Sequence, residues 1–382
     1  MSDPNKSKNI LLLGLVSLLN DISSEIIQPV LPIFIAALGG SSVAIGLIGG
    51  ISDGLPSIFK LSAGCWSDRA GKRKPLVVAG YGLSALAKLL LAFSAIWQQV
   101  FLLKTAERCG KGIRSAPRDA MISESVVESR RGRGFGLHRS MDSAGAVIGS
   151  VMAYLLWQGG LDYRSILLVA GVLSVLALIP FYMVRESHVS PCSEQGLRLS
   201  GLSPQLKKFL AISILFSLGN FSYMFFILRV QSLFFGREAV TLSMLLYVLY
   251  NLVYAGLAMP VGIWSDRVGR KKVLTIGYSL FALTALGFAF VSALFGLAVL
   301  FALYGLVFAL VDASERAFVS DLSDAQMRGS SLGVYYGLVG AAAILSSLIA
   351  GGLWELYGPQ GTFVFGAGAA AIAAAGLHRM RT

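Results

Sequence analysis

The chain has 382 residues, of which 55% are hydrophobic and 14% are charged, and its formal net charge is +12 at pH 7. Soluble domains are about 25% charged, so the composition excludes an ordinary soluble globular protein and predicts a polytopic membrane protein. The excess of Lys and Arg lies in short loops between apolar segments. There it meets lipid headgroups, so the net charge does not indicate a nucleic-acid partner.

The apolar segments are long and unbroken, which favours helices over barrel strands. A membrane-spanning helix needs about 20 mostly apolar residues, whereas barrel strands alternate over about 10. We therefore predict an all-α membrane protein with twelve transmembrane helices. In chain order the predicted spans are residues 10–37, 41–65, 75–96, 99–124, 134–157, 163–184, 207–235, 240–264, 273–293, 296–318, 329–352 and 360–378.

The first apolar stretch is too long for the hydrophobic region of a signal peptide and contains Asp21 and Glu25. We expect it to remain as the first span. The three cysteines, Cys65, Cys109 and Cys192, show no metal-ligand spacing and do not predict a disulfide framework.

A charged loop occurs twice in the chain. The segment GCWSDRAGKRK at 64–74 returns as GIWSDRVGRKK at 262–272, so that Asp68 and Asp266 are 198 residues apart (266 − 68). Arg118 and Arg316 repeat this separation, which indicates an internal duplication. We predict two pseudo-symmetric six-helix lobes, residues 1–185 and 207–382, joined by a polar cytoplasmic linker at 186–206.

The distribution of basic residues predicts the orientation, because cytoplasmic loops are enriched in Lys and Arg. We predict a multi-pass protein of the plasma (inner) membrane with both termini cytoplasmic. The residues that fall on the predicted cytoplasmic side are Lys6, Lys8, Arg69–Lys74, Arg130–Arg133, Lys207, Lys208, Arg267–Lys272, Arg328, Arg379 and Arg381.

The doubled loop, Gly-x-x-x-Asp-Arg-x-Gly followed by three basic residues, resembles the signature of the major facilitator superfamily (MFS). The resemblance covers essentially the whole chain, because the copies lie at half-chain spacing among twelve predicted spans. It implies two six-helix bundles that rock about a midplane site lined by the first, fourth, seventh and tenth spans.

Two further elements resemble those of drug/proton antiporters in this family. Arg108 and Gly112 match an Arg-x-x-x-Gly element, and Gly145 and Gly149 match a Gly-x-x-x-Gly-Pro element in which Ser150 replaces the proline. The fourth span departs from many proton-coupled exporters in carrying two further cations, Lys111 and Arg114.

Ionisable residues within a span are costly and normally face protein or water, so they mark the candidate cavity. Asp21 and Glu25 lie one helical turn apart, and Lys104, Arg108 and Lys111 form a stripe on one helix face. An acid beside a base can change charge with the proton that it holds, so Asp21 and Glu25 are the predicted coupling acids. The alternative is a permanent ion pair with Arg108 or Lys111 that only fixes helix packing.

The fifth predicted span places His138 and Asp142 on the same face as Gly145 and Gly149, with Arg139 alongside. The acid and the imidazole form a candidate proton relay, although a histidine near the end of a span can also be simply solvated. The glycines have a second interpretation, because small residues four apart allow close helix approach.

Asn20 and Asn220 form a pseudo-symmetric pair flanking the predicted cavity, and Arg229 adds a cation in the seventh span. The asparagines could bind solute through hydrogen bonds or hold helices together. Together with the residues above, they complete the predicted coupling and substrate-binding set.

The duplicated loop predicts a cytoplasmic gate. A carboxylate at a helix end accepts charge-assisted hydrogen bonds from arginine, which predicts one cluster at the second and fourth spans and another at the eighth and tenth. The alternative is that these residues only determine loop structure and topology. The predicted gating residues are Asp68, Arg69, Arg118, Asp266, Arg267 and Arg316.

The sequence lacks a phosphate-binding Gly-x-x-x-x-Gly-Lys-Ser/Thr loop and catalytic metal spacing, so we expect neither an enzyme nor a cofactor. The prediction is a monomeric secondary active transporter of a small molecule, working by proton-coupled export, with protons and membrane lipid as partners. Alternatives are a symporter or exchanger of a small anionic solute, a channel or sensor, and a divalent-metal exporter using Asp21, Glu25, His138 and Asp142.

Overall fold

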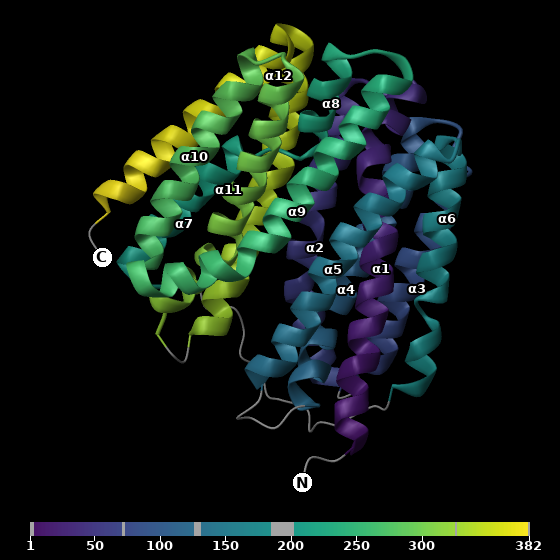
Figure 1. The fold of residues 1–382 in the computed structure, drawn as a ribbon. Helices are drawn as coiled ribbons and strands as arrows, with labels where there is room; N and C mark the ends of the chain where they lie inside the picture. The colour runs from purple at the N-terminus through teal and green to yellow at the C-terminus, as the bar shows by residue number, and fades with distance from the viewer. Residues whose placement is uncertain (1–3, 71–72, 126–130, 185–201, 325–326, 381–382) are drawn as a thin grey trace. The chain divides into compact units, whose positions relative to one another are not determined.

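The computed structural model describes residues 4–70, 73–125, 131–184, 202–324 and 327–380, and all regular elements among them are helical (Figure 1). The predicted all-α class is confirmed. The chain divides into two compact units, Met1–Gly39 with Leu55–Glu194, and Gly40–Gly54 with Gln195–Thr382. Most of the predicted linker at 186–206 lies outside the described residues, so the predicted lobe boundaries stay predictions.

The first unit contains the helices of the N-terminal half except for the start of α2, and the second contains the helices of the C-terminal half. Helix α2 begins in the second unit and ends in the first. The helices are α1 (Pro4–Ala37), α2 (Ser42–Ala70), α3 (Lys74–Leu91), α4 (Trp97–Glu124), α5 (Arg131–Gln158), α6 (Tyr163–Leu176), the 3-10 helix η2 (Ile179–Met183), α7 (Pro204–Gly219), α8 (Met224–Leu233), α9 (Gly236–Val268), α10 (Arg270–Phe290), α11 (Leu294–Asp321) and α12 (Arg328–Arg379).

Helical segments lie at all twelve predicted spans. Nine helical segments of the described chain are long and apolar enough to cross a membrane, and α4 and α5, with 28 residues each, are comparably long but more polar. The 52-residue α12 contains two predicted spans, because the backbone breaks at Gly358 (φ 70°, ψ −171°) and Pro359 follows. A Pro has no N–H to continue the helix, and the positive φ suits Gly.

The helix boundaries also repeat with the sequence. Shifting α4 by the repeat distance of 198 residues gives 295–322, and α11 spans Leu294–Asp321. The same shift of α3 gives 272–289, and α10 spans Arg270–Phe290. The duplication therefore extends from the charged loop to the lengths of the helices.

The seventh predicted span is a broken helix, with α7 ending at Gly219 and α8 beginning at Met224. Serines of α12 bind the main chain around the break. The Ser222 N–H donates to Ser347 Oγ at 3.1 Å, and Ser346 Oγ donates to the Leu218 carbonyl at 2.8 Å. Such internal pairing allows non-helical backbone at membrane depth.

The first half of α2 belongs to the second unit because its glycines pack directly on α12. A β-carbon at Gly46 would lie 2.2 Å from the Ser347 carbonyl oxygen, and one at Gly54 would lie 2.1 Å from the Gly340 oxygen. Gly50, midway between them, would similarly meet Ile344 Cα at 2.9 Å. We call this contact the α2–α12 seam.

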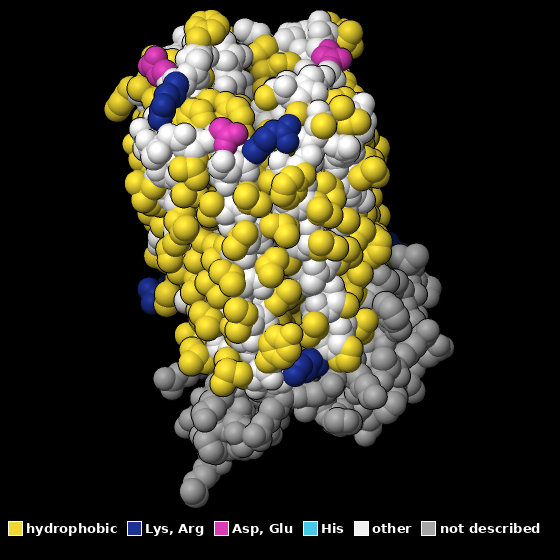
Figure 2. Space-filling view, turned by 90° about the vertical axis from the view of Figure 1, so that its right-hand side faces the viewer, with side chains coloured by type: hydrophobic (Ala, Val, Ile, Leu, Met, Phe, Trp, Pro, Cys, Tyr) yellow, Lys and Arg dark blue, Asp and Glu magenta, His cyan; other side chains and the backbone are white. Residues whose placement is uncertain are grey.

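One face of the molecule is covered largely by apolar side chains, with charged side chains gathered near its ends (Figure 2). Exposed apolar side chains on α3 and α6 include Leu83, Leu86, Leu168 and Val172. Helices that present apolar side chains outward are typical of a protein solvated by lipid.

Candidate functional site

A polar chain of contacts joins four helices of the first unit. Asp142 on α5 lies 3.3 Å from His138 Nδ1 and accepts a hydrogen bond from Ser17 Oγ of α1 at 2.8 Å. Arg118 of α4 donates to Ser17 Oγ at 3.1 Å and pairs with Asp119 at 2.9 Å. Asp119 in turn lies 3.5 Å from Lys60 Nζ of α2. We call these six residues the polar chain: His138, Asp142, Ser17, Arg118, Asp119 and Lys60.

Asp21 and Glu25 lie on α1 where α5 approaches closely, and Asp21 is within electrostatic reach of Asp142 and Arg118 of the polar chain. A β-carbon at Gly145 would lie 3.1 Å from Asp21 Cβ, and one at Gly149 would lie 2.7 Å from Glu25 Cβ. Both acids are half-buried. Glycine is required at 149, because a side chain there would also meet the Ile22 carbonyl oxygen at 2.5 Å.

Several charges act on Asp21. The polar chain contributes Asp142 and Arg118, and α4 contributes Lys111 and Arg114. An acid with both an acidic and several basic neighbours has a charge that responds to theirs, which is the electrostatic arrangement that proton coupling needs. The coupling roles themselves stay predictions.

Arg108 has a buried ion-pair partner within its own helix. Its Nε lies 3.2 Å from Glu107, whose carboxylate also lies 2.8 Å from Lys104 Nζ, and all three side chains are at most 5% exposed. Two cations therefore share one carboxylate inside α4. Glu107 is therefore an acid available to Arg108 on its own helix. The predicted alternative of a permanent ion pair stays a prediction.

Asn20 forms part of a buried site for Lys88. Lys88 of α3 is fully buried and donates to the main-chain carbonyl and Oδ1 of Asn20, both at 3.1 Å, and to Ser24 Oγ at 2.8 Å. A buried ammonium needs such acceptors. This geometry supports the interpretation of Asn20 as a residue that holds helices together.

Two predicted cations lie in different settings. Arg229 of α8 is buried and donates to the Phe288 carbonyl at 2.9 Å and to the Ala289 carbonyl at 3.4 Å, at the end of α10. A cation stabilises the C-terminal carbonyls of a helix. Arg139 of α5 is exposed, and Asn220 lies in the break between α7 and α8.

The second copy of the charged loop forms a cluster, but with a different cation from the one predicted. Arg270 lies 3.2 Å from Asp266 of α9 and 2.8 Å from Asp321 of α11, and donates to the Ala317 carbonyl at 2.8 Å. Arg316 instead pairs with Asp312 one turn away, at 2.5 Å. We call the contacts of Arg270 the Arg270 brace.

Three of the predicted gating residues remain, one in the second copy of the charged loop and two in the first. Arg267 is exposed. The side chains of Asp68 and Arg69 in the first copy lie outside the described part of the structure. The gating roles stay predictions.

Sequence reasoning passed over Ser17 and Glu107. Both have a signal in hindsight, since Ser17 lies one turn before Asp21 and Glu107 lies three residues after Lys104. Within the described chain, no group of three or more His, Cys, Asp or Glu side chains is placed to hold a metal ion.

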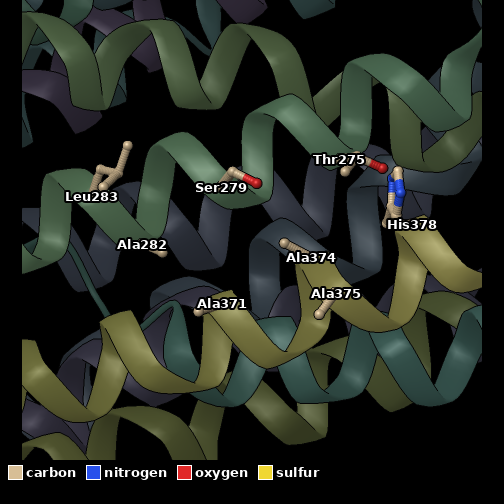
Figure 3. Close-up of a pocket in the computed structure, with 8 residues that line it drawn as sticks. All are labelled: Thr275, Ser279, Ala282, Leu283, Ala371, Ala374, Ala375 and His378. Carbon is tan, nitrogen blue, oxygen red and sulfur yellow. The ribbon is translucent and has the colours of Figure 1, made fainter.

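A cavity of about 520 Å³ lies between α10 and the last segment of α12 (Figure 3). Its lining is mostly apolar, with Thr275, Ser279 and His378 as the polar members. None of the predicted site residues lines this cavity, so it is separate from the charged clusters of the first unit.

Comparisons with known proteins place these features in a family. The Major Facilitator Superfamily model matches residues 13–242 and 209–381. An uncharacterized MFS-type transporter of Methanocaldococcus jannaschii is 44% identical over 96% of this chain and 93% of its own length. Multidrug resistance protein MdtH of Edwardsiella ictaluri is 24% identical over 78% of this chain and 75% of its own length.

Among solved structures, the nucleoside transporter NupG has a similar fold. It superposes with a TM-score of 0.79 over 99% of both chains, at 16% sequence identity. This likeness extends over both units and bears on the fold alone.

Proposed function

This chain belongs to the Major Facilitator Superfamily of transporters, and on that premise we propose that it exports a small organic compound in exchange for protons. It is a multi-pass membrane transporter of a small molecule rather than an enzyme. The proton coupling and the outward direction are the proposed parts.

The observation that carries the proposal is the pair of half-buried acids on α1, Asp21 and Glu25, of which Asp21 lies within electrostatic reach of the polar chain. A carboxylate in a membrane interior is stable either protonated or near a cation. Proton binding at Asp21 changes its attraction for Arg118 and Lys111, and a solute that needs the ionised acid competes with the proton. Such competition couples an inward proton to an outward solute.

The direction rests on two likenesses. The relatives include a protein named as a multidrug resistance protein, and the glycine element that resembles the antiporter motif packs α5 against α1 at Asp21 and Glu25. The resemblance and the packing therefore meet at the same acids.

A second candidate is a symporter or exchanger of a small anionic solute. It is favoured by the excess of cations in α4, where Lys104, Arg108, Lys111 and Arg114 accompany one fully buried acid among the described side chains, Glu107. If these cations bind an anionic solute, neutralising Lys111 would abolish solute binding. If the protein is an exporter that relies on Asp21, the same change would leave solute binding intact.

The distribution of basic loops supports an orientation with both termini cytoplasmic, in the plasma or inner membrane. Together with the rest of the proposal, we assign membrane lipid and protons as partners of a monomeric transporter.

The test uses purified protein in liposomes with an imposed proton gradient. Asp21→Asn and Glu25→Gln should abolish gradient-driven solute movement while solute binding stays measurable by thermal shift. Asp162→Asn is the matched control, because it neutralises an exposed carboxylate that caps α6 and leaves a capping side chain. If both variants with a neutral residue in α1 accumulate solute like the unmodified protein, these acids do not couple transport.

A further inference from the structure

The second unit contains a buried carboxylate that the proposed coupling site does not use. Glu315 of α11 is 5% exposed. Its two oxygens each accept a short hydrogen bond from a phenol, one from Tyr278 of α10 and the other from Tyr335 of α12. Three helices therefore converge on one carboxyl group.

Other side chains around Glu315 offer it no direct counter-ion. Arg316, the next residue, is engaged with Asp312 at 2.5 Å, and no ion pair of Glu315 occurs among the described residues. On the α7 side, Phe216 stacks on Tyr278 with ring centroids 3.9 Å apart. The carboxyl group is enclosed by phenols and an aromatic ring, so its ionised form is costly.

The two tyrosines suit both charge states of the acid. A phenol can donate a hydrogen bond to a carboxylate, or accept one from a protonated carboxyl group after its hydroxyl rotates. Neither state leaves the carboxyl group without a hydrogen-bond partner. The geometry is therefore that of a group that can gain and lose a proton without rearrangement of its helices.

Glu315 has no acidic counterpart at the repeat distance in the first unit. The residue at the repeat distance of 198 in the first unit is Pro117, whereas the adjacent Arg316 corresponds to Arg118 of the polar chain. The acid was therefore added, or retained, in the second unit alone, next to the counterpart of a polar-chain residue.

We propose that Glu315, with Tyr278 and Tyr335, is a second proton-binding site, located in the second unit. This inference deepens the proposed proton coupling and rests on it for its role in transport. Proton binding itself is independent of that role. The groups that would influence the site are the two phenols, Asp312 and Arg316.

Infrared difference spectroscopy of the purified protein at acid and alkaline pH tests the site directly. We expect a protonated-carboxyl band that is lost in Glu315→Gln and shifted in Tyr335→Phe, which removes one hydrogen bond. Glu238→Gln, a change at an exposed acid of the same unit, should leave the band unchanged. Tyr335→Phe keeps the site testable should Glu315→Gln not fold.

A spectrum that is the same with and without the Glu315 carboxyl group would overturn the inference. A band that responds to sodium at fixed pH and not to protons would overturn it too. Transport is a separate readout. Loss of coupling in Asp21→Asn with an unchanged Glu315 spectrum would leave the proposed function intact, whereas a titrating Glu315 without proton-driven transport would refute the proposed function alone.

Discussion

At the scale of single residues, the buried ion cluster of α4 has fewer acids than cations. The Glu107 carboxylate contacts two cations, Lys104 and Arg108, and the field of a third, Lys88, also reaches it. Removing the shared carboxylate leaves several buried cations without their acid, whereas removing one cation leaves a pair.

We therefore predict that Glu107→Gln lowers the free energy of unfolding by about 3 to 5 kcal/mol, the cost of leaving buried charge without its partner. Lys104→Met should cost clearly less, because Glu107 keeps Arg108. Thermal unfolding in detergent measures both. Equal losses in the two variants would mean that Glu107 is not the centre of the cluster.

The sequence predicted this part of the site incompletely, for a physical reason. Helical spacing placed Lys104, Arg108 and Lys111 on one face of α4, and that periodicity follows from backbone geometry alone. The choice of partner depends on the directions of long side chains, which spacing does not determine. As a result, spacing suggested the acids of α1 as possible partners of Arg108 and passed over Glu107 on the same helix.

At the scale of helices, the closest packing in the first unit is between α1 and α5. Gly149 lets the two backbones approach beside Glu25, because any side chain there would overlap Ile22. A glycine on the same helix, Gly136, has nothing within 4 Å of its missing β-carbon. The two positions allow the same substitution with opposite expected results.

Gly149→Ala should destabilise the protein by about 1 to 3 kcal/mol through overpacking and displace Glu25, whose Cβ lies beside Gly149. Gly136→Ala should be neutral or stabilise α5 by up to about 1 kcal/mol, the helix-propensity gain. Melting temperatures in detergent, with transport assayed in parallel, separate the two. The role assigned to the close contact is wrong if Gly149→Ala melts like Gly136→Ala.

The glycine pattern predicted the close contact, but nothing comparable predicted the break between α7 and α8. Gly219 and Asn220 are a helix-stopping pair, yet they lie within a long apolar stretch whose length indicates one continuous span. The break is stabilised by Ser346 and Ser347 of α12, which are distant in sequence. Local propensity contains no information about such tertiary partners.

At the scale of the whole molecule, α3 and α4 of the first unit match α10 and α11 of the second at the repeat distance, but the interiors of the two units differ. The first unit buries Lys88, Lys104 and Arg114, whereas the second buries stacked aromatic rings such as Phe216 on Tyr278 and Phe226 on Tyr304. The charged first unit is suited to ion and solute chemistry. The second unit offers an aromatic interior in which Glu315 is the buried acid among the described residues.

Alternating access requires two ends of the transporter to open in turn, and the second unit has a distinctive contact at each. Near one end the Arg270 brace joins Asp266 and Asp321. The second contact lies where the first segment of α12 approaches its break. There a β-carbon at Gly351 would lie 2.7 Å from the Ser42 carbonyl oxygen of the α2–α12 seam. We predict that the brace and the seam are coupled, so that loosening one favours closure of the other.

Single cysteines at Ser320, near the brace, and at Ser42, in the seam, would report this coupling in a variant without Cys65, Cys109 and Cys192. Arg270→Gln should raise the rate of thiol labelling at Ser320→Cys several-fold and lower it at Ser42→Cys. Lys272→Gln removes an equal charge from an exposed side chain of the same loop and serves as the control. If labelling becomes faster only at Ser320→Cys, the brace is a local support for its loop and not part of a gate, because a gate must change accessibility at both ends of the molecule.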